Sequence, residues 1–467
     1  MQQTSNSSHT KAVLALVVLS YAMIVLDISI VLTALPRLQA DLGFSNAGLT
    51  WMSSIYTLFF GGFLLLGGKL GDLYGRRRIY MLGLSIFAFA SLAIGSAQSA
   101  GFIIAARAVQ GLGAAILAPS TLALLQVTFP AGEERNRAVA WYAAAAGVSA
   151  SFGMVLGGVL ADIISWRAGF FINLPISVGL LIVALRYVKE TDRFAGKIDV
   201  VGAVLSTVGL GALVFASVHA AEQGRGNWGS VGVLTLGFAL LAAFLVHEAR
   251  VHEPLLPLRL LTHAERGGAY GARVLFLGAN VSFYFFVAQY MQEVLGLSAA
   301  ETGLAFFPAT FVNFLAAMNV PKMIARFGRG PVLIISYLTC GVGLAWLSLL
   351  GTDSNLWTEI MLPMVFVGFG QGAAMAPLTS SGIAGVKAED VGAASGMVNV
   401  AHQLGSSLGL ALLVALAALT STSGATRLAI AERTAHALQG GALFVLAALL
   451  VSWMLILRPA PDTQDIQ

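Results

Sequence analysis

The chain has 467 residues, of which 57% are hydrophobic and only 10% are charged, and its formal net charge is +4. Soluble domains carry roughly 25% charged residues, so this composition excludes an ordinary soluble surface and predicts a polytopic membrane protein. A soluble protein with a very large core is the alternative, but many separate runs reach about 20 apolar residues. The single cysteine, Cys340, excludes an intrachain disulfide, and no His or Cys cluster indicates a metal site.

The apolar runs predict an all-α protein with about fourteen membrane-spanning helices. The first run is too long for a signal peptide, contains Asp27 and lacks a small-residue cleavage site, so we interpret it as a retained helix. The predicted helices are, in chain order, 12–35, 47–67, 79–98, 101–125, 137–160, 168–187, 199–220, 230–249, 268–291, 302–320, 331–350, 357–379, 396–418 and 440–458.

The distribution of basic residues predicts the orientation of these helices. If both termini are cytoplasmic, most of the 26 Lys and Arg residues fall on cytoplasmic loops, as the positive-inside rule requires. A missed helix would reverse every later loop and remove this bias. We therefore predict a multi-pass protein of the cell membrane, surrounded by the lipid bilayer, whose positive charge reflects its loops and not a nucleic-acid partner.

Two pairs of stretches indicate a faint internal repeat. GKLGDLYGRRR at 68–78 resembles PKMIARFGRGP at 321–331, and GAAILAP at 113–119 resembles QGAAMAP at 371–377. Chance similarity between runs of small residues is the alternative, but repeats of this kind are typical of transporters. The predicted parts are an N-terminal six-helix half at 1–198, two inserted helices at 199–250, a cytoplasmic linker at 251–267 and a C-terminal six-helix half at 268–467.

The loop GKLGDLYGRRR follows the second predicted helix. Its glycines allow a tight turn beside packed helix ends, and membrane anchoring explains its arginines but not the spacing of Gly68, Asp72 and Gly75. The loop resembles the signature G-x-L-a-D-r-x-G-r-k of the major facilitator superfamily. The resemblance implies a conformational gate at Gly68, Asp72, Gly75, Arg76 and Arg77.

Two charged residues lie inside predicted membrane helices, Asp27 in the first and Arg107 in the fourth. Charges at membrane depth are unfavourable and mark functional sites by default. Both lie a few residues from the outer helix ends, so they can pair. Desolvation and a nearby cation shift a carboxyl pKa in opposite directions, which suits a group that changes protonation during a cycle. A static buried ion pair and, for Arg107, snorkelling to the interface are the alternatives.

Further motifs narrow the resemblance to the fourteen-helix drug:proton antiporter branch of that superfamily, the multidrug resistance exporter type. VLDISIVLTALP at 25–36 resembles its L-D-x-T-I-V-N-V-A-L-P, and RAVQGLGAA at 107–115 resembles the family motif R-x-x-q-G-x-g-a. WRAGFFINLP at 166–175 and the stretch 289–308 resemble later motifs of the branch. The branch implies a major facilitator fold, proton coupling at Asp27 and Arg107, and a proton gradient in place of a cofactor.

The stretch GVSASFGMVLGG at 147–158 resembles the antiporter signature, a glycine-rich helix that ends G-P-x-x-G-G. Gly153, Gly157 and Gly158 match, but Met154 replaces the proline, so a fixed kink is no longer implied. The same glycines would also serve plain helix contact. The candidates for lining the substrate cavity, which could equally form interhelical hydrogen bonds, are Asn173, Tyr284, Gln289 and Gln292.

The leading interpretation is a proton-coupled antiporter, and not an enzyme. It would export amphipathic or cationic organic compounds such as drugs, dyes and antiseptics by alternating access. We expect it to act as a monomer whose partners are its small-molecule substrate and protons. A dedicated metabolite exporter or a proton symporter of the same fold stays open because the proline is missing. A membrane enzyme or receptor is a third class, but no nucleophile–base pair or nucleotide loop supports it.

Overall fold

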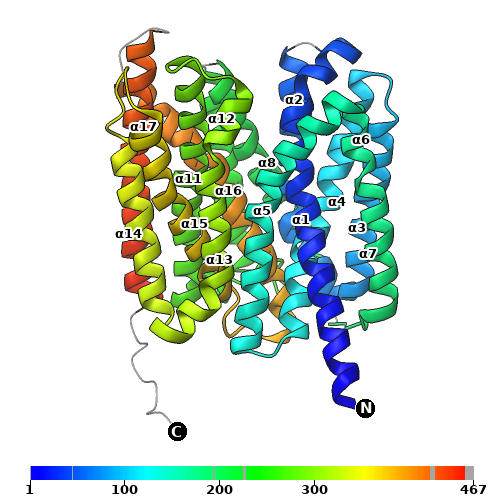
Figure 1. The fold of residues 1–467 in the computed structure, drawn as a ribbon. Helices are drawn as coiled ribbons and strands as arrows, with labels where there is room; N and C mark the ends of the chain where they lie inside the picture. Colours follow the sequence, from blue (N-terminus) through cyan, green and yellow to red (C-terminus); the bar gives the residue numbers. More distant parts are fainter. Residues whose placement is uncertain are drawn as a thin grey trace. The chain divides into compact units, whose positions relative to one another are not determined.

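The computed structural model describes residues 2–44, 46–191, 193–194, 196–223, 228–420 and 426–457. Within these ranges the regular secondary structure is entirely helical (Figure 1), which confirms the predicted all-α class. Every predicted segment contains helix, and twelve described helices are long and apolar enough to cross a membrane. The predicted seventh span is present, although its apolar stretch, Val200–Ala216, is shorter.

The chain divides into two compact units. Unit 1 comprises Met1–Pro257 and Val386–Val400, and unit 2 comprises Leu258–Gly385 and Ala401–Gln467. The predicted boundaries at 198, 250 and 267 stay predictions. The first nine helices, all in unit 1, are α1 (Gln2–Leu42), α2 (Asn46–Tyr74), α3 (Arg76–Gly95), α4 (Ala100–Thr128), α5 (Glu133–Ile163), α6 (Trp166–Phe171), α7 (Asn173–Tyr187), α8 (Val200–Gln223) and α9 (Trp228–Glu248).

From Leu258 onward the chain forms unit 2, except that the 3-10 turn η2 and the start of α16 belong to unit 1. Its elements are α10 (Arg259–Thr262), α11 (Ala264–Glu293), α12 (Ala299–Ala305), α13 (Phe307–Phe327), α14 (Arg329–Leu347), the π-helical turn η1 (Leu356–Met361), α15 (Leu362–Gly382), the 3-10 turn η2 (Ala388–Asp390), α16 (Val391–Thr420) and α17 (Arg427–Leu455).

The same packing order occurs in both units. In unit 1, α2 and α3 pack on α4, and in unit 2, α13 and α14 pack on α15. Glycines bring these helices close: a Cβ on Gly67 would collide with the backbone of Ala115, and one on Gly368 would collide with the backbone of Ala309. Of the repeated stretches, 113–119 lies in α4 and 371–377 lies in α15. Each contains a proline that is buried inside its helix, Pro119 in α4 and Pro377 in α15.

The two inserted helices are joined at one end. α8 packs on α9 and also on α2. His247 Nε2 lies 2.9 Å from Asp199 Oδ2, and the Gly202 N–H donates to Asp199 Oδ1. Burial raises the pKa of Asp199, but these two hydrogen bonds outweigh it, and the pKa falls below its ordinary value. The His247–Asp199 contact therefore holds the start of α8 against the end of α9.

Several helices extend beyond their predicted spans, and the last helix differs most. The last helix begins at Arg427 and not near residue 440, and the Thr426 hydroxyl accepts a hydrogen bond from the Ala429 N–H at 3.2 Å. Hydropathy detects only the apolar part of a helix, the part that crosses the hydrocarbon core. It therefore misses a polar first turn, whose start is set by a capping residue.

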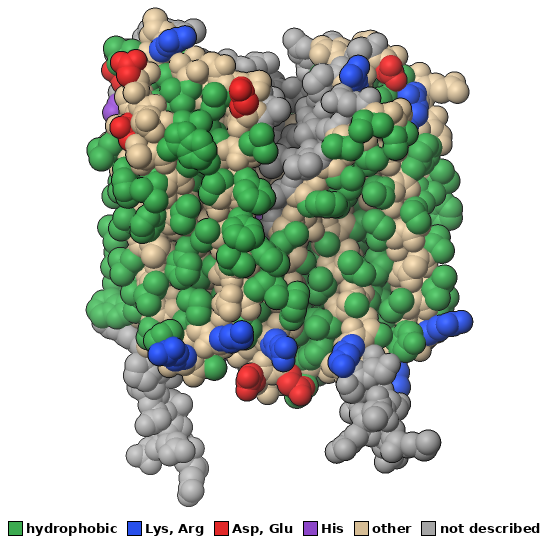
Figure 2. Space-filling model, in the orientation of Figure 1, with side chains coloured by type: hydrophobic (Ala, Val, Ile, Leu, Met, Phe, Trp, Pro, Cys, Tyr) green, Lys and Arg blue, Asp and Glu red, His purple; other side chains and the backbone are tan. Residues whose placement is uncertain are grey.

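The surface agrees with a chain that crosses a membrane. Figure 2 shows hydrophobic side chains over most of the visible face, with Lys and Arg side chains gathered along its lower rim. Phe89, Leu304 and Trp357 are each about 70% exposed. Large apolar side chains can remain this exposed where lipid, and not water, surrounds them.

Candidate functional site

A buried polar cluster in unit 1 surrounds Asp27. Asp27 lies inside α1 and is only 1% exposed. Arg107 of α4 donates from Nη1 to Asp27 Oδ2 at 2.8 Å, while Gln110 and Asn173 donate to Asp27 Oδ1 at 2.9 and 2.7 Å. The fold thus brings together the two predicted membrane charges and Asn173, which we expected to line a substrate cavity.

The hydrogen bonds continue beyond the carboxylate. Gln110 accepts from Arg107 at 2.6 Å, one helical turn away on the same face of α4. It also donates to Ser91 Oγ of α3 at 2.8 Å. The Arg107 guanidinium lies over the ring of Tyr56 from α2, 4.2 Å from the ring centre. Helices α1, α2, α3, α4 and α7 therefore all contribute to one site.

The bond from Arg107 is charge-assisted, which makes it stronger than a bond between neutral groups. The cluster is nevertheless incompletely satisfied. Arg107 Nε and Asn173 Oδ1 are buried and have no hydrogen-bond partner among the described residues. Protonation of Asp27 would remove the charge from its bond to Arg107, which joins α1 to α4.

Sequence reasoning missed two members of this cluster. Ser91 and Tyr56 are ordinary residues in apolar helices, and no motif marks them. Gln110 was noted only as part of a motif, although its spacing of three residues from Arg107 already predicts a shared helix face. The roles of Asp27 and Arg107 in proton coupling stay predictions.

The segment 68–78, which the sequence predicted as a loop, is helical except at Gly75, because α2 runs to Tyr74 and α3 begins at Arg76. It is bound to the start of α16, within the same unit. Asp72 is buried and accepts from Arg76 Nη2 at 2.8 Å and from the Gly392 N–H at 3.0 Å. A carboxylate is favourable at a helix N-terminus, where N–H groups are unpaired. A Cβ on Gly68 would collide with the Gly392 carbonyl, so this glycine is needed for the close approach.

The same loop also contacts the segment after α7. Gly75 has φ +99°, a conformation that favours glycine, and a Cβ there would lie 2.5 Å from Glu190 Oε1. The Arg77 N–H donates to that oxygen at 3.1 Å, and Arg77 Nη2 donates to the Leu185 carbonyl at 3.1 Å. Gly75 and Arg77 thus fix the turn between α2 and α3 against the segment after α7.

Comparison with known proteins identifies the family. Residues 17–410 and 269–466 match the profile described as Major Facilitator Superfamily. The chain belongs to the major facilitator superfamily. It is therefore a multi-pass membrane transporter, with the major facilitator fold that the motifs implied.

Relatives of this major facilitator protein are exporters and resistance proteins. It is 37% identical to the cephamycin export protein CmcT of Amycolatopsis lactamdurans, over 96% of this chain and 93% of that protein. It is 35% identical to the puromycin resistance protein pur8 of Streptomyces alboniger, over 95% and 90% of the two chains. The crystal structure of the human organic anion transporter MFSD10 matches 95% of this chain and 99% of its own, with a TM-score of 0.68 and 15% identity, which supports the fold alone.

The glycine-rich helix of this major facilitator protein packs beside Asp27. A Cβ on Gly153 of α5 would lie 2.8 Å from Ser29 Cβ and 3.0 Å from the Leu26 carbonyl oxygen on α1. Gly157 is buried one turn further along, and the packing at Gly158 lies outside what the structure describes. Gly153 therefore sets the distance between α5 and the part of α1 that carries the carboxylate.

Replacing Gly153 with Ala is expected to destabilise the protein by about 1–3 kcal/mol, as overpacking of a tight core does. Thermal unfolding of the purified protein measures this loss. Gly179 of α7 is the matched control, because a Cβ there would meet nothing within 4 Å. Equal unfolding temperatures for the two alanine variants would contradict the assigned contact.

The other candidate cavity residues of this major facilitator protein lie in unit 2. The Tyr284 hydroxyl donates to Gln371 Oε1 at 3.0 Å, and Asn313 donates to the same oxygen at 2.9 Å. Gln289 instead donates to Glu293 at 3.1 Å, and Gln292 is exposed near the end of α11. Among these, Tyr284 alone joins a polar cluster deep in its helix.

In the described part of the chain, no group of three or more His, Cys, Asp or Glu could hold a metal ion.

Proposed function

We propose that this transporter is a proton-coupled antiporter that exports amphipathic or cationic organic compounds. The observation that carries the proposal is the buried Asp27–Arg107 pair, held by Gln110 and Asn173. An ionisable residue deep in a membrane helix is retained where ions or protons move. We further propose that it works as a monomer in the cell membrane, with both termini in the cytoplasm and a proton gradient as its energy source.

In the proposed cycle, Asp27 takes up a proton when its side chain is accessible from outside. The neutral carboxyl no longer holds the guanidinium, and Arg107 is then held by its contacts with Gln110 and with the ring of Tyr56, whose face attracts a cation. When the site opens to the cytoplasm, Asp27 releases the proton and binds Arg107 again. A cationic substrate would compete with the proton for the ionised carboxylate, so Asp27 would bind either the proton or the substrate, but not both at once.

The loop at 68–78 would act as the gate of this cycle. Its carboxylate, Asp72, bonds Arg76 and the start of α16 in the conformation described here. In alternating access, we propose that the bonds from Asp72 to Gly392 break in one half of the cycle and re-form in the other. The state with the Asp72–Gly392 bonds formed and the state with them broken would then be two discrete conformations, as a gate requires.

A second candidate is a dedicated exporter of one compound. It is favoured by the two relatives, each of which is named for a single antibiotic, and by Met154 in place of the proline of the antiporter signature. The two candidates share the same coupling site and differ only in the breadth of the substrate cavity.

Uptake into inverted membrane vesicles separates these candidates. A panel of unrelated organic cations and dyes is offered with and without a pH gradient, and a protonophore removes the gradient in the control. The proposal predicts that several compounds are taken up and that they compete with one another for uptake. It also predicts that the protonophore stops this uptake. A dedicated exporter would take up one compound and ignore the rest, and uptake that is indifferent to the gradient would refute proton coupling.

A further inference from the structure

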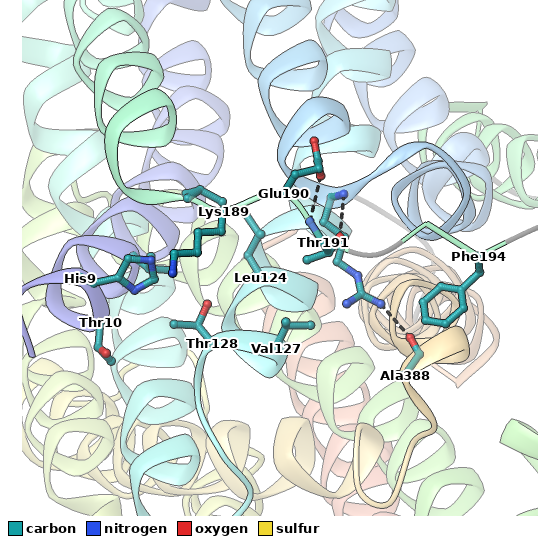
Figure 3. A pocket seen from close by; sticks show the side chains of 13 residues that line it. His9, Thr10, Leu124, Val127, Thr128, Lys189, Glu190, Thr191, Phe194 and Ala388 are labelled. Atoms are coloured by element: carbon teal, nitrogen blue, oxygen red, sulfur yellow. Dashed lines mark hydrogen bonds between the residues drawn. The ribbon is translucent and has the colours of Figure 1, made fainter. Parts of the chain in front are cut away.

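A cavity of about 440 Å³ lies in unit 1, away from Asp27. The start of α1, the start of α3 and the end of α4 line it together with residues 188–191, Phe194 and Ala388 of η2 (Figure 3). Its walls combine apolar side chains, among them Leu124 and Val127, with hydroxyl groups of Thr10, Thr128 and Thr191. The function proposed above does not use this cavity.

The basic groups of the cavity face one another without an acid between them. In Figure 3 the Lys189 side chain extends toward the ring of His9. His9 Nε2 is buried and has no hydrogen-bond partner among the described residues. An anion placed between these two nitrogen-bearing groups would accept hydrogen bonds from both.

The one acid among the lining residues, Glu190, is already engaged. Its Oε1 accepts from the N–H groups of Arg77 and Thr191 at 3.1 and 3.2 Å, and its Oε2 lies 3.7 Å from Arg78 Nε. This carboxylate is therefore directed to the turn before α3 and does not neutralise Lys189.

Arg76 supplies a further donor. Its side chain is almost fully buried, and Nη2 donates to Asp72 and to the Ala388 carbonyl. Its Nε is also buried and has no hydrogen-bond partner among the described residues. An anion in the cavity would satisfy Nε and leave both Nη2 bonds in place. A bound anion would therefore favour the conformation in which Asp72 holds the start of α16.

The depth of the cavity indicates the source of the anion. His9 lies just before the apolar run of α1 that starts at residue 12, Arg76 begins the apolar span of α3, and Thr128 ends that of α4. All three mark the level at which hydrocarbon gives way to headgroups. Basic pockets between helix ends at this level suit lipid phosphates, and Val127, which is 47% exposed, provides an apolar edge.

We propose that this cavity binds the phosphate headgroup of an anionic phospholipid, between Lys189, His9 and Arg76. The lipid comes from the leaflet at this end of the unit. Its phosphodiester accepts hydrogen bonds from the basic groups while its chains remain in the bilayer. The site is independent of the proton-coupling role of Asp27, so either proposal can fail alone.

The test is lipid binding to the full chain, purified in a neutral detergent. Phosphatidylglycerol is titrated in mixed micelles, and the thermal unfolding temperature gives the apparent affinity. Phosphatidylcholine and soluble glycerol phosphate are titrated in parallel. We expect phosphatidylglycerol alone to raise the unfolding temperature. Lys189→Ala should weaken its binding by roughly fivefold, since each basic residue at a charged membrane surface contributes on the order of 1 kcal/mol.

Lys197→Ala is the matched control, because Lys197 lies exposed in the same connection between α7 and α8 but outside the cavity lining. Lys189→Arg, which keeps the charge, should bind as the unmodified chain does. Three results would overturn the proposal: equal affinity in Lys189→Ala and the unmodified chain, equal weakening by Lys197→Ala, or an equal response to soluble glycerol phosphate. The last result would assign the cavity to a soluble phosphate ester.

Discussion

Replacing Asp27 with Asn is expected to abolish the part of transport that depends on the pH gradient. The amide keeps the shape of the side chain, and its oxygen can still accept from Gln110 and Asn173, but it cannot bind and release a proton. Substrate uptake by inverted vesicles should therefore fall to the rate measured without a gradient. Any residual downhill movement should no longer respond to pH.

Two controls make this result specific. Asp41→Asn removes another carboxylate of α1, one that is exposed near the C-terminal end of the helix. Hydrogen bonds from the Trp166 indole and from Arg167, at 2.9 and 3.1 Å, hold the pKa of Asp41 below its ordinary value. Asp41 therefore stays ionised at neutral pH and should not exchange protons, so its variant should keep coupling. If Asp27→Asn still accumulated substrate at the normal rate, Asp27 would not be the coupling site.

Replacing Arg107 with Met is expected to be the most destabilising single change in this cluster. It leaves the buried Asp27 carboxylate without its cation, and breaking a buried pair in this way costs about 3–5 kcal/mol. Adding Asp27→Asn to this variant should recover most of that stability, because no uncompensated charge remains. Transport should stay uncoupled in both variants, since the first lacks the cation and the second lacks both the cation and the acid.

Thermal unfolding of the four chains in a double-mutant cycle measures this coupling directly. The unmodified chain, the two single variants and the double variant must be compared in the same detergent at the same pH. A strictly additive cycle would show that the 2.8 Å contact between Arg107 and Asp27 contributes nothing to stability. An unfolding temperature unchanged by Arg107→Met would lead to the same conclusion.

The sequence by itself determined the class of protein and where its helices run. Hydropathy is a local property, and a span needs a run of apolar residues whatever its neighbours are. The same reasoning singled out Asp27 and Arg107, because a charge within such a run is unfavourable wherever the helix packs. Hydropathy did not predict polar extensions such as the first turns of α17. These turns begin at a capping residue and not at the start of an apolar run.

Only the tertiary structure decided which groups meet. Helical periodicity places Gln110 on the face of Arg107, but it says nothing of Ser91 and Tyr56, which arrive from α3 and α2. The bond between Asp72 and Gly392 joins residues 320 positions apart, and the cavity at Lys189 is formed by helix ends that are distant in the chain. Such contacts depend on how helices pack in three dimensions, and inside a membrane the packing follows small-residue contacts and hydrogen bonds that hydropathy does not record.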